Sequence, residues 1–180
     1  SIVKECEELG VEAMALSADV SDDEACRKTA NETLDRWGRI DCLVNNAGTT
    51  KFVFNHGDLE GLDADDFLHI YKVNVVGPFQ MVRACKEALN KSDNPSVINI
   101  SSIAGIKGIG SSIAYASSKG ALNTMTISMA RNLGPIRVNA ICPGFIQGEW
   151  LKKGLGEEVY NASLKNLESS TPLSLAVTPD

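Results

Sequence analysis

The sequence has few of the residues on which several common classes of protein depend. Only two histidines are present, and the five cysteines stand apart from one another without a C-x-x-C pair. A metal site is therefore not expected, because zinc needs such ligands at short spacings. An odd number of scattered cysteines, mostly in apolar runs, also argues against a disulfide framework. It indicates a reducing compartment, so a cytoplasmic protein is the default expectation.

Long hydrophobic runs and an excess of positive charge are missing as well. No apolar stretch reaches the ~20 residues of a membrane helix, and no basic-then-apolar signal peptide is present. The formal net charge of the 180 residues is −6. Nucleic acid and anionic membranes need a basic surface, so neither is an expected partner. A phosphate-bearing cofactor is still compatible with this charge, because backbone amides and a helix terminus can hold it.

What is present is a regular alternation of strand and helix patterns in a chain long enough for one domain. The expected strands are Met14–Ala18, Ile40–Val44, Ser96–Ile100 and Ile136–Ile141. The expected helices cover residues 2–9, 21–37, 63–89 and 112–133, with a capping box at Ser21 and Glu24 and a kink at Pro78. The tail from Glu149 is expected to be helical, and residues 147–170 to form a substrate lid. This alternation is typical of a parallel sheet with helices on both faces.

Three side chains near the carboxyl end of the third expected strand could carry chemistry. Tyr115 and Lys119 are four residues apart on a helix, so they share a face. A nearby ammonium lowers the pKa of a phenol from ~10, which would let Tyr115 exchange protons at neutral pH. The Ser102 hydroxyl, thirteen residues earlier, could polarise the same carbonyl oxygen. The alternatives are an ordinary surface pair and a plain polar transition from strand to loop.

Other polar and small residues could bind a ligand at the ends of the strands. Asn74 interrupts an apolar helix, so it is either solvated or holds something such as a water molecule. Asn45-Asn46-Ala47-Gly48 and Pro143-Gly144 would let a flat ring approach the backbone, and Asp19 could accept a hydrogen bond from an exocyclic amine. Plain turns are the alternative for each. The Gly105–Gly110 run fits no phosphate-binding pattern and is expected to be a flexible loop beside the substrate.

Taken together, these elements resemble the motifs of the short-chain dehydrogenase/reductase family. They occur in the same order and at the same spacings as in that family, from about residue 10 to residue 148. The resemblance implies a Rossmann-type, doubly wound α/β fold in a single domain over residues 1–180. The matching elements are Ala18-Asp19-Val20, Asn45-Asn46-Ala47-Gly48, Asn74, Ser102, Tyr115-x-x-x-Lys119, Arg137-Val138-Asn139 and Pro143-Gly144.

The same resemblance implies an NAD- or NADP-dependent enzyme that moves a hydride between nicotinamide and a secondary alcohol/ketone pair. Tyr115 would be the general acid/base, and Lys119 would lower its pKa and bind the nicotinamide ribose. Ser102 would orient the substrate oxygen, and Asn74 would hold a water that links Lys119 to solvent. Cofactor contacts are further implied for Asp19, Val20, Asn46, Ala47, Gly48, Pro143, Gly144 and Ile146.

The sequence departs from the family pattern in two respects. The family's first two strands, its glycine-rich TGxxxGxG turn and its last strand are missing, so we expect an internal stretch of a chain of about 250 residues. Such a stretch alone would bind dinucleotide weakly or not at all, and the Met14–Ala18 strand would have no neighbour. Gly148 stands where the family often has a threonine that contacts the cofactor carboxamide, which puts that contact in question.

Two other functions fit part of the pattern. A non-catalytic binding or regulatory subunit of the same fold is one, although the complete set Asn74, Ser102, Tyr115 and Lys119 argues against it. A nucleotide-sugar epimerase or dehydratase is the other, and the Asn-Asn-Ala-Gly turn and the short C-terminal region argue against that.

The sequence leaves the small-molecule substrate open. The larger apolar residues of the expected lid suit a partly hydrophobic substrate, whereas Lys152 and Lys153 would suit an acidic one. Alternatively, the lid packs on the domain and its lysines are solvated. Aliphatic residues on more than one face of the two long helices suggest a homodimer or homotetramer. The lid residues concerned are Trp150, Leu151, Leu155, Val159 and Tyr160.

Overall fold

A computed structural model describes residues 1–178, apart from the side chain of Trp150. Three parallel strands form one sheet in the order β1-β2-β3. Their bounds are Cys42–Asn45 for β1, Ser96–Ile100 for β2 and Arg137–Ile141 for β3. The α/β class and the parallel sheet expected from the sequence are confirmed.

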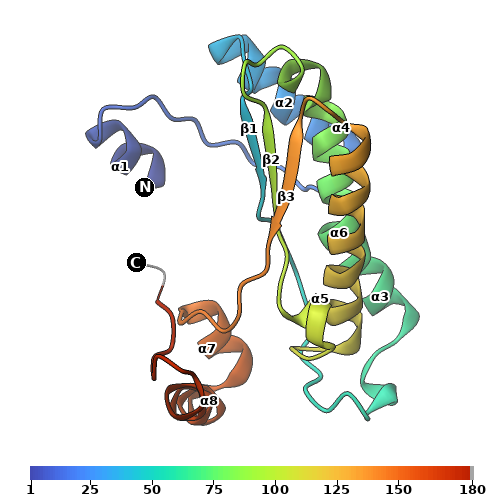
Figure 1. Ribbon diagram of the computed structural model, residues 1–180, viewed down its shortest axis with the longest axis vertical. Helices are drawn as coiled ribbons and strands as arrows, with labels where there is room; N and C mark the ends of the chain where they lie inside the picture. Colours follow the sequence, from blue (N-terminus) through green and yellow to red (C-terminus); the bar gives the residue numbers. More distant parts are fainter. Residues whose placement is uncertain (179–180) are drawn as a thin grey trace.

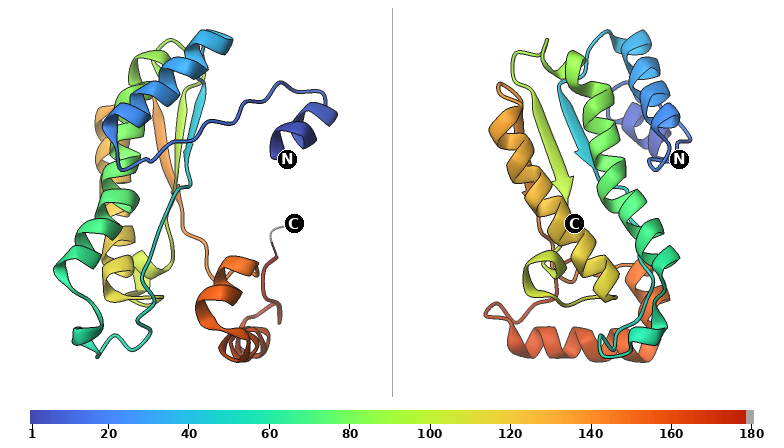
Figure 2. Two further views of the ribbon diagram at one scale, coloured as in Figure 1. Left: turned by 180° about the vertical axis from the view of Figure 1, so that it is seen from behind. Right: turned by 90° about the vertical axis from the view of Figure 1, so that its right-hand side faces the viewer.

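The helices that connect the strands lie against one face of the sheet, as Figure 1 shows for α4 and α6. Helix α2, which precedes β1, packs with α4 on that same face, whereas α1, α7 and α8 lie on the opposite side and away from the strands (Figure 2). The helices are α1 (Ile2–Glu8), α2 (Asp23–Trp37), α3 (Ala64–Tyr71), α4 (Gly77–Leu89), α5 (Ala104–Lys107), α6 (Ile113–Asn132), α7 (Glu149–Leu155) and α8 (Glu157–Ser170), with a 3-10 turn at Leu59–Gly61.

Burial alternates along each strand, as it must when only one face of a sheet is covered. Leu43, Val97 and Val138 point toward the helices and are at most 9% exposed. They form the core with side chains from α2 and α4. On the other face, Val44 is 53% and Ile141 is 51% exposed. The described residues therefore fit a fragment of the Rossmann-type doubly wound fold expected from the sequence, with the connecting helices on one face of the sheet.

Two expectations about local structure are wrong. Residues 14–18 are not in a strand, because no described strand lies beside them to take up their backbone hydrogen bonds. Helix α2 starts from Asp22, whose side chain accepts a hydrogen bond from the backbone of Glu24, and not from a box at Ser21. The Ser21 backbone N–H is instead used by the Asp19 carboxylate at 2.8 Å, in a turn that precedes the helix.

The long helix expected over residues 63–89 is divided into three parts. Asp63 caps α3 through a capping box with Asp66, and a π-helical turn over Lys72–Val76 joins α3 to α4. Pro78 lies in the first turn of α4, directly after this π-helical turn. The irregularity therefore falls just before the proline, in the turn that carries Asn74. π-helical turns of this kind occur frequently at functional sites.

Part of the expected glycine-rich loop is a helix. Residues Ala104–Lys107 form α5, which ends at Gly108 with φ 66°. A Cβ on Gly105 would lie 2.5 Å from the backbone nitrogen of Gly120, so α5 and α6 touch backbone to backbone. Tertiary packing of two glycines thus orders a segment that its composition marks as a loop.

The chain beyond β3 forms α7 and α8, which lie beyond the carboxyl ends of the strands (Figure 1). Gly156, with φ 77°, separates the two helices. The segment after α8 returns to pair Val177 with Ile146, and the backbone N–H of Gln147 donates to the Val177 carbonyl at 2.8 Å. The expected helical tail is confirmed, and its position over the strand ends is where a lid would have to lie.

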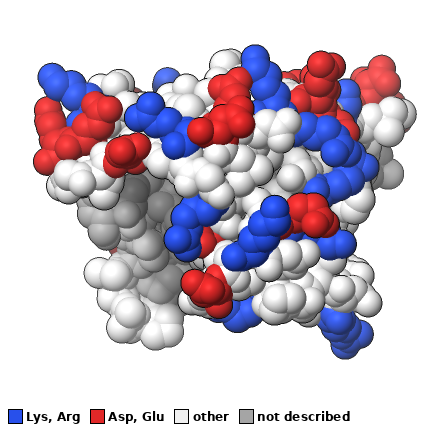
Figure 3. Space-filling view, turned by 90° about the horizontal axis from the view of Figure 1, so that it is seen from above, with Lys and Arg blue, Asp and Glu red and all other residues white. Residues whose placement is uncertain are grey.

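The opposite end of the molecule carries charges of both signs. Figure 3 shows that Lys and Arg side chains are interspersed with Asp and Glu side chains on this face. Arg39 and Asp41, for example, pair at 2.8 Å just before β1. The described residues seen in this view form no continuous basic patch of the kind that nucleic acid binds. No helix within residues 1–178 is long and apolar enough to cross a membrane.

Candidate active site

The first turn of α6 fixes the position of Tyr115. Ser112, which is fully buried, caps the helix by accepting a hydrogen bond from the backbone of Tyr115 at 3.2 Å. Small side chains at Ala114, Ala116 and Ser118 let α6 pack closely on its neighbours. The phenol is therefore carried by a helix that is rigid at both the cap and the packed face.

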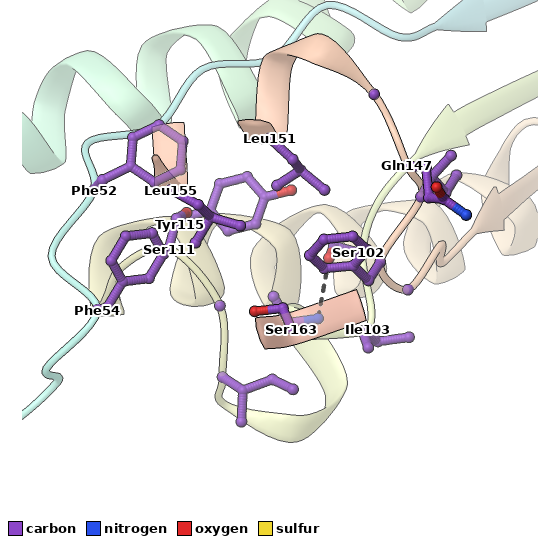
Figure 4. A pocket seen from close by; sticks show the side chains of 17 residues that line it. Phe52, Phe54, Ser102, Ile103, Ser111, Tyr115, Gln147, Leu151, Leu155 and Ser163 are labelled. Carbon is purple, nitrogen blue, oxygen red and sulfur yellow. Dashed lines mark hydrogen bonds between the residues drawn. The ribbon is translucent and has the colours of Figure 1, made fainter. Parts of the chain in front are cut away.

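Ser102 and Tyr115 line the same cavity, which has a volume of about 480 Å³. Figure 4 shows the Tyr115 hydroxyl pointing into this cavity on the side of Ser102 and Leu151. Ser102 follows β2, and its hydroxyl accepts a hydrogen bond from the backbone of Ala104 at 3.1 Å. Two hydroxyl groups that are far apart in the sequence thus face one ligand-sized space beyond the carboxyl ends of the strands.

Lys119 lies one helical turn after Tyr115 and is only 4% exposed. Its Nζ donates to the Ile100 carbonyl at 2.8 Å and lies 5.7 Å from the centroid of the Tyr115 ring. Burial lowers the pKa of this ammonium to about 8, against a smaller opposing effect from Cys142. Only one of the three N–H donors of the ammonium is used by the Ile100 carbonyl, so two can serve a ligand.

The pKa of Tyr115 does not follow the sequence expectation. Burial raises the pKa of the phenol, and a hydrogen bond with Ser102 acts in the opposite direction. The expected lowering by Lys119 does not appear, because the ammonium lies beside the ring and donates to the Ile100 carbonyl. Burial accordingly favours the protonated phenol, a proton donor, over the phenolate.

Asn74 fastens the loop after β1 to helix α6. It is fully buried, and its Nδ2 donates to the Thr49 carbonyl at 2.9 Å and to the Ser118 hydroxyl at 3.0 Å. Its Oδ1 accepts from the Thr49 backbone at 2.8 Å. A Cβ on Gly48 would lie 3.5 Å from this Oδ1 and 3.7 Å from the Lys119 Nζ. The structure thus brings Asn74, Gly48 and Lys119 together, while the water-holding role of Asn74 stays a prediction.

A buried polar network beneath the site was not foreseen from the sequence. Asn45 on β1 donates to Asn99 on β2 at 2.9 Å, and Asn99 donates to the Thr126 hydroxyl on α6 at 2.9 Å. Ser101 adds a bond to the Lys119 carbonyl at 3.2 Å. The sequence carried one signal of this network. Both asparagines follow the same alternation as the apolar core residues of their strands, so their side chains point inward as well. Together these bonds fix α6 relative to the strand ends.

Several of the residues expected to bind the cofactor line one of two cavities. Gly144 and Ile146 line the same cavity as Tyr115, while the Pro143 carbonyl accepts from the backbone of Ile103 at 3.0 Å. Val20, Asn46 and Ala47 line a second cavity of about 120 Å³ beside β1. Asp19 lines neither, since its exposed carboxylate is turned back to Ser21.

Comparison with known proteins bears directly on this arrangement. Residues 1–180 match the family model described as enoyl-(acyl carrier protein) reductase. A solved structure described as a short-chain dehydrogenase/reductase from Burkholderia xenovorans is 40% identical, with a TM-score of 0.86 over 97% of this chain and 67% of that one. The chain belongs to the short-chain dehydrogenase/reductase family. The expected family membership is thereby confirmed.

Other members of the short-chain dehydrogenase/reductase family are similar over most of the chain. 3-Oxoacyl-(acyl-carrier-protein) reductase of Thermotoga maritima is 32% identical over 93% of this chain and 67% of the relative. Trans-4-hydroxycyclohexanecarboxylate dehydrogenase of Sinomonas cyclohexanicum is 35% identical over 81% of this chain and 56% of the relative. NAD+-bound xylitol dehydrogenase superposes with a TM-score of 0.87 at 28% identity, over 98% of this chain and 72% of that one. The chain thus spans between about half and two thirds of the length of these curated relatives.

Proposed function

We propose that the protein is an NAD(P)-dependent oxidoreductase that transfers a hydride between nicotinamide and a secondary alcohol/ketone pair. The observation that carries the proposal is the convergence of the Ser102 and Tyr115 hydroxyls in one cavity, with the buried Lys119 one helical turn away. Relatives named as dehydrogenases and reductases, among them structures that hold NAD+ or NADP, support it.

In this proposal, Ser102 and Tyr115 hold the oxygen of the substrate. During reduction, the phenol of Tyr115 gives its proton to that oxygen, and during oxidation the phenolate takes it back. Ser102 stabilises the charge that develops on the oxygen. A charged Lys119 favours the phenolate that remains on Tyr115 after proton transfer. Burial raises the pKa of Tyr115, which favours the protonated phenol that reduction needs.

The residues present fit a nicotinamide dinucleotide. The ammonium of Lys119 has donors to spare for ribose hydroxyls, and Gly144 and Ile146 would flank the nicotinamide in the cavity that holds Tyr115. Asn46, Ala47 and Val20 would bind toward the adenine side through the second cavity. When bound, the nicotinamide supplies or accepts the hydride. The protein residues bind and orient it, and they exchange the proton.

Residues 147–170 would act as the substrate lid. Helix α7 contributes Leu151 and Leu155 to the cavity, and α8 contributes Ser163. The lid is anchored at its start, where the Gly148 backbone donates to the Tyr160 hydroxyl at 3.3 Å and the Phe145 and Tyr160 rings lie 5.6 Å apart.

Assembly into a homodimer or homotetramer is part of the same proposal. Apolar side chains are exposed on the helices beside the sheet, including Leu68 at 67%, Phe79 at 44% and Ile127 at 56%. Such exposed positions on neighbouring helices suit contact with a second copy of the chain. Sedimentation of the full-length protein would measure the mass of the assembly.

A turnover assay of the full-length protein tests the proposed activity. Wild type is screened with ketones and secondary alcohols against both nicotinamide cofactors, and Tyr115→Phe is compared with Tyr71→Phe as a matched control outside the cavity. We expect Tyr115→Phe to lose about 10²- to 10⁴-fold in turnover while cofactor binding is retained. Tyr71→Phe should match wild type. Absence of any turnover in wild type would instead favour the non-catalytic binding subunit.

A further inference from the structure

We propose that the cavity beside Tyr115 selects an uncharged, ring-bearing ketone or alcohol and rejects substrates that carry a carboxylate or a phosphate. The inference deepens the proposed oxidoreductase function and rests on it. It concerns the part of the substrate that extends away from the reacting oxygen.

The lining of the cavity carries no charge among the described residues. Its larger side chains are aromatic or aliphatic, and the remaining polar groups are neutral hydroxyls and one amide. A carboxylate placed there would lose its hydration without gaining a cation, which is strongly unfavourable. The larger apolar residues of the wall are Phe52, Phe54, Ile109, Phe145, Leu151 and Leu155.

Apart from Lys119, whose free donors the proposed function assigns to the cofactor ribose, the lysines near this region are engaged elsewhere or lie outside the cavity. The Lys152 Nζ pairs with Glu157 at 3.3 Å, and Lys51 pairs with Asp66 at 2.6 Å. Neither lysine lines the cavity, and the exposed Lys153 does not line it either. His56, which lies nearby, directs its Nε2 to the Gly110 carbonyl at 3.3 Å. Of the two substrate types that the sequence left open, the structure therefore favours the hydrophobic one over the acidic one.

The aromatic part of the wall is held in place by packing. The Phe52 and Phe54 rings lie 5.4 Å apart, on the loop between β1 and α3. Phe52 also lies so close to Gly154 of α7 that a Cβ there would overlap its ring. In Figure 4 the two phenylalanines stand at one side of the cavity with Leu155, away from Ser102. This arrangement offers flat apolar surfaces at the end of the cavity that is remote from the reacting oxygen.

The cavity beside Tyr115 is large enough for a substrate with more than one ring. A protein cavity of ~150 Å³ holds a single benzene molecule. The cavity here has about 480 Å³, so space for a substrate of up to two rings remains when part of it is given to the nicotinamide. Pockets of this size are typical of small-molecule sites.

A matched pair of ketones tests the inference on the full-length protein. 4-(4-Methylphenyl)cyclohexanone and 4-(4-oxocyclohexyl)benzoate differ only in a methyl group against a carboxylate. Both turnover, as kcat/KM with saturating cofactor, and equilibrium binding by calorimetry are measured. We expect wild type to prefer the methyl compound at least tenfold in both measurements, since the carboxylate finds no cation in the cavity.

Variants that add a positive charge test whether the cavity wall determines this selectivity. Phe54 is 48% exposed, so Phe54→Arg should fold and place a cation at the cavity wall. We expect it to reduce the preference at least tenfold, mainly through better binding of the benzoate. Leu59→Arg adds the same charge in the 3-10 turn at Leu59–Gly61, outside the lid, at a 70% exposed position that does not line the cavity, and it should keep the wild-type ratio.

The two measurements separate the two proposals. Selective binding of the methyl ketone without any turnover would overturn the oxidoreductase function and leave the inference about the cavity standing. Turnover or binding of the benzoate equal to that of the methyl ketone would overturn the inference while the function stands. Failure of the methyl ketone to bind, or an equal effect of Phe54→Arg and Leu59→Arg on the ratio, would also overturn it.

Discussion

Replacing Lys119 by methionine should stabilise the unliganded protein at neutral pH while it removes activity. Methionine keeps most of the volume of the buried side chain but carries no charge. Burial lowers the pKa of Lys119 from 10.5 to about 8. A difference of about 2.5 in pKa corresponds to about 3 kcal/mol of unfavourable free energy for the charged side chain below pH 8. The lost hydrogen bond to the Ile100 carbonyl offsets about 1 kcal/mol of the gain, so we expect a net stabilisation of about 2 kcal/mol near pH 7.

The pH dependence distinguishes this cause from better packing. Between the folded pKa of about 8 and the ordinary lysine pKa of 10.5, the unfolded wild type binds more protons at this position than the folded wild type. The stability of wild type therefore rises with pH through this window, and the advantage of Lys119→Met shrinks. From about pH 7 to about pH 9.5 the advantage should fall by about 2 kcal/mol.

Urea unfolding of wild type and Lys119→Met at both pH values measures this difference directly. Lys86→Met, at an exposed position on α4, is the control and should show no pH-dependent gain over wild type. A difference between wild type and Lys119→Met that is the same at both pH values would refute the reasoning, because it would mean that the buried ammonium costs nothing in the folded state.

Two further predictions concern the scaffold of the site. Asn99→Leu should destabilise the protein by about 2–4 kcal/mol in urea unfolding, because the Asn45 amide loses its partner while buried; a loss below about 0.5 kcal/mol would contradict a structural role for the network. Gly105→Ala should cost about 1–3 kcal/mol, since its Cβ would collide with the Gly120 backbone. Gly134→Ala, whose Cβ would meet open space, is the control, and an equal loss in both variants would show that the α5–α6 contact is not tight.

Much of the fold could be predicted from local patterns. The strands Ser96–Ile100 and Ile136–Ile141 and the helix from Ser112 follow from apolar periodicity and capping residues, and the structure matches them closely. The exception at Met14–Ala18 has a simple cause. A strand needs a hydrogen-bonded neighbour, and residue patterns within the segment do not reveal whether that neighbour is present.

The sequence predicted which residues form the candidate site better than it predicted the contacts between them. Ser102 and Tyr115 were expected to meet because one follows a strand and the other begins the next helix. The Asn45–Asn99 bond joins residues 54 positions apart and depends on the register of β1 with β2. The pKa of Tyr115 was predicted in the wrong direction, because spacing on a helix does not report how deeply a phenol is buried.

The central claim is that Ser102 and Tyr115 act together on one substrate oxygen. A double-mutant cycle of Ser102→Ala and Tyr115→Phe, measured as kcat/KM for carbonyl reduction by the full-length protein, tests it most directly. Residues that act as a unit give strongly non-additive effects, so the double variant should be little slower than Tyr115→Phe alone. Losses that simply multiply, or a Tyr115→Phe variant as fast as wild type, would contradict the account.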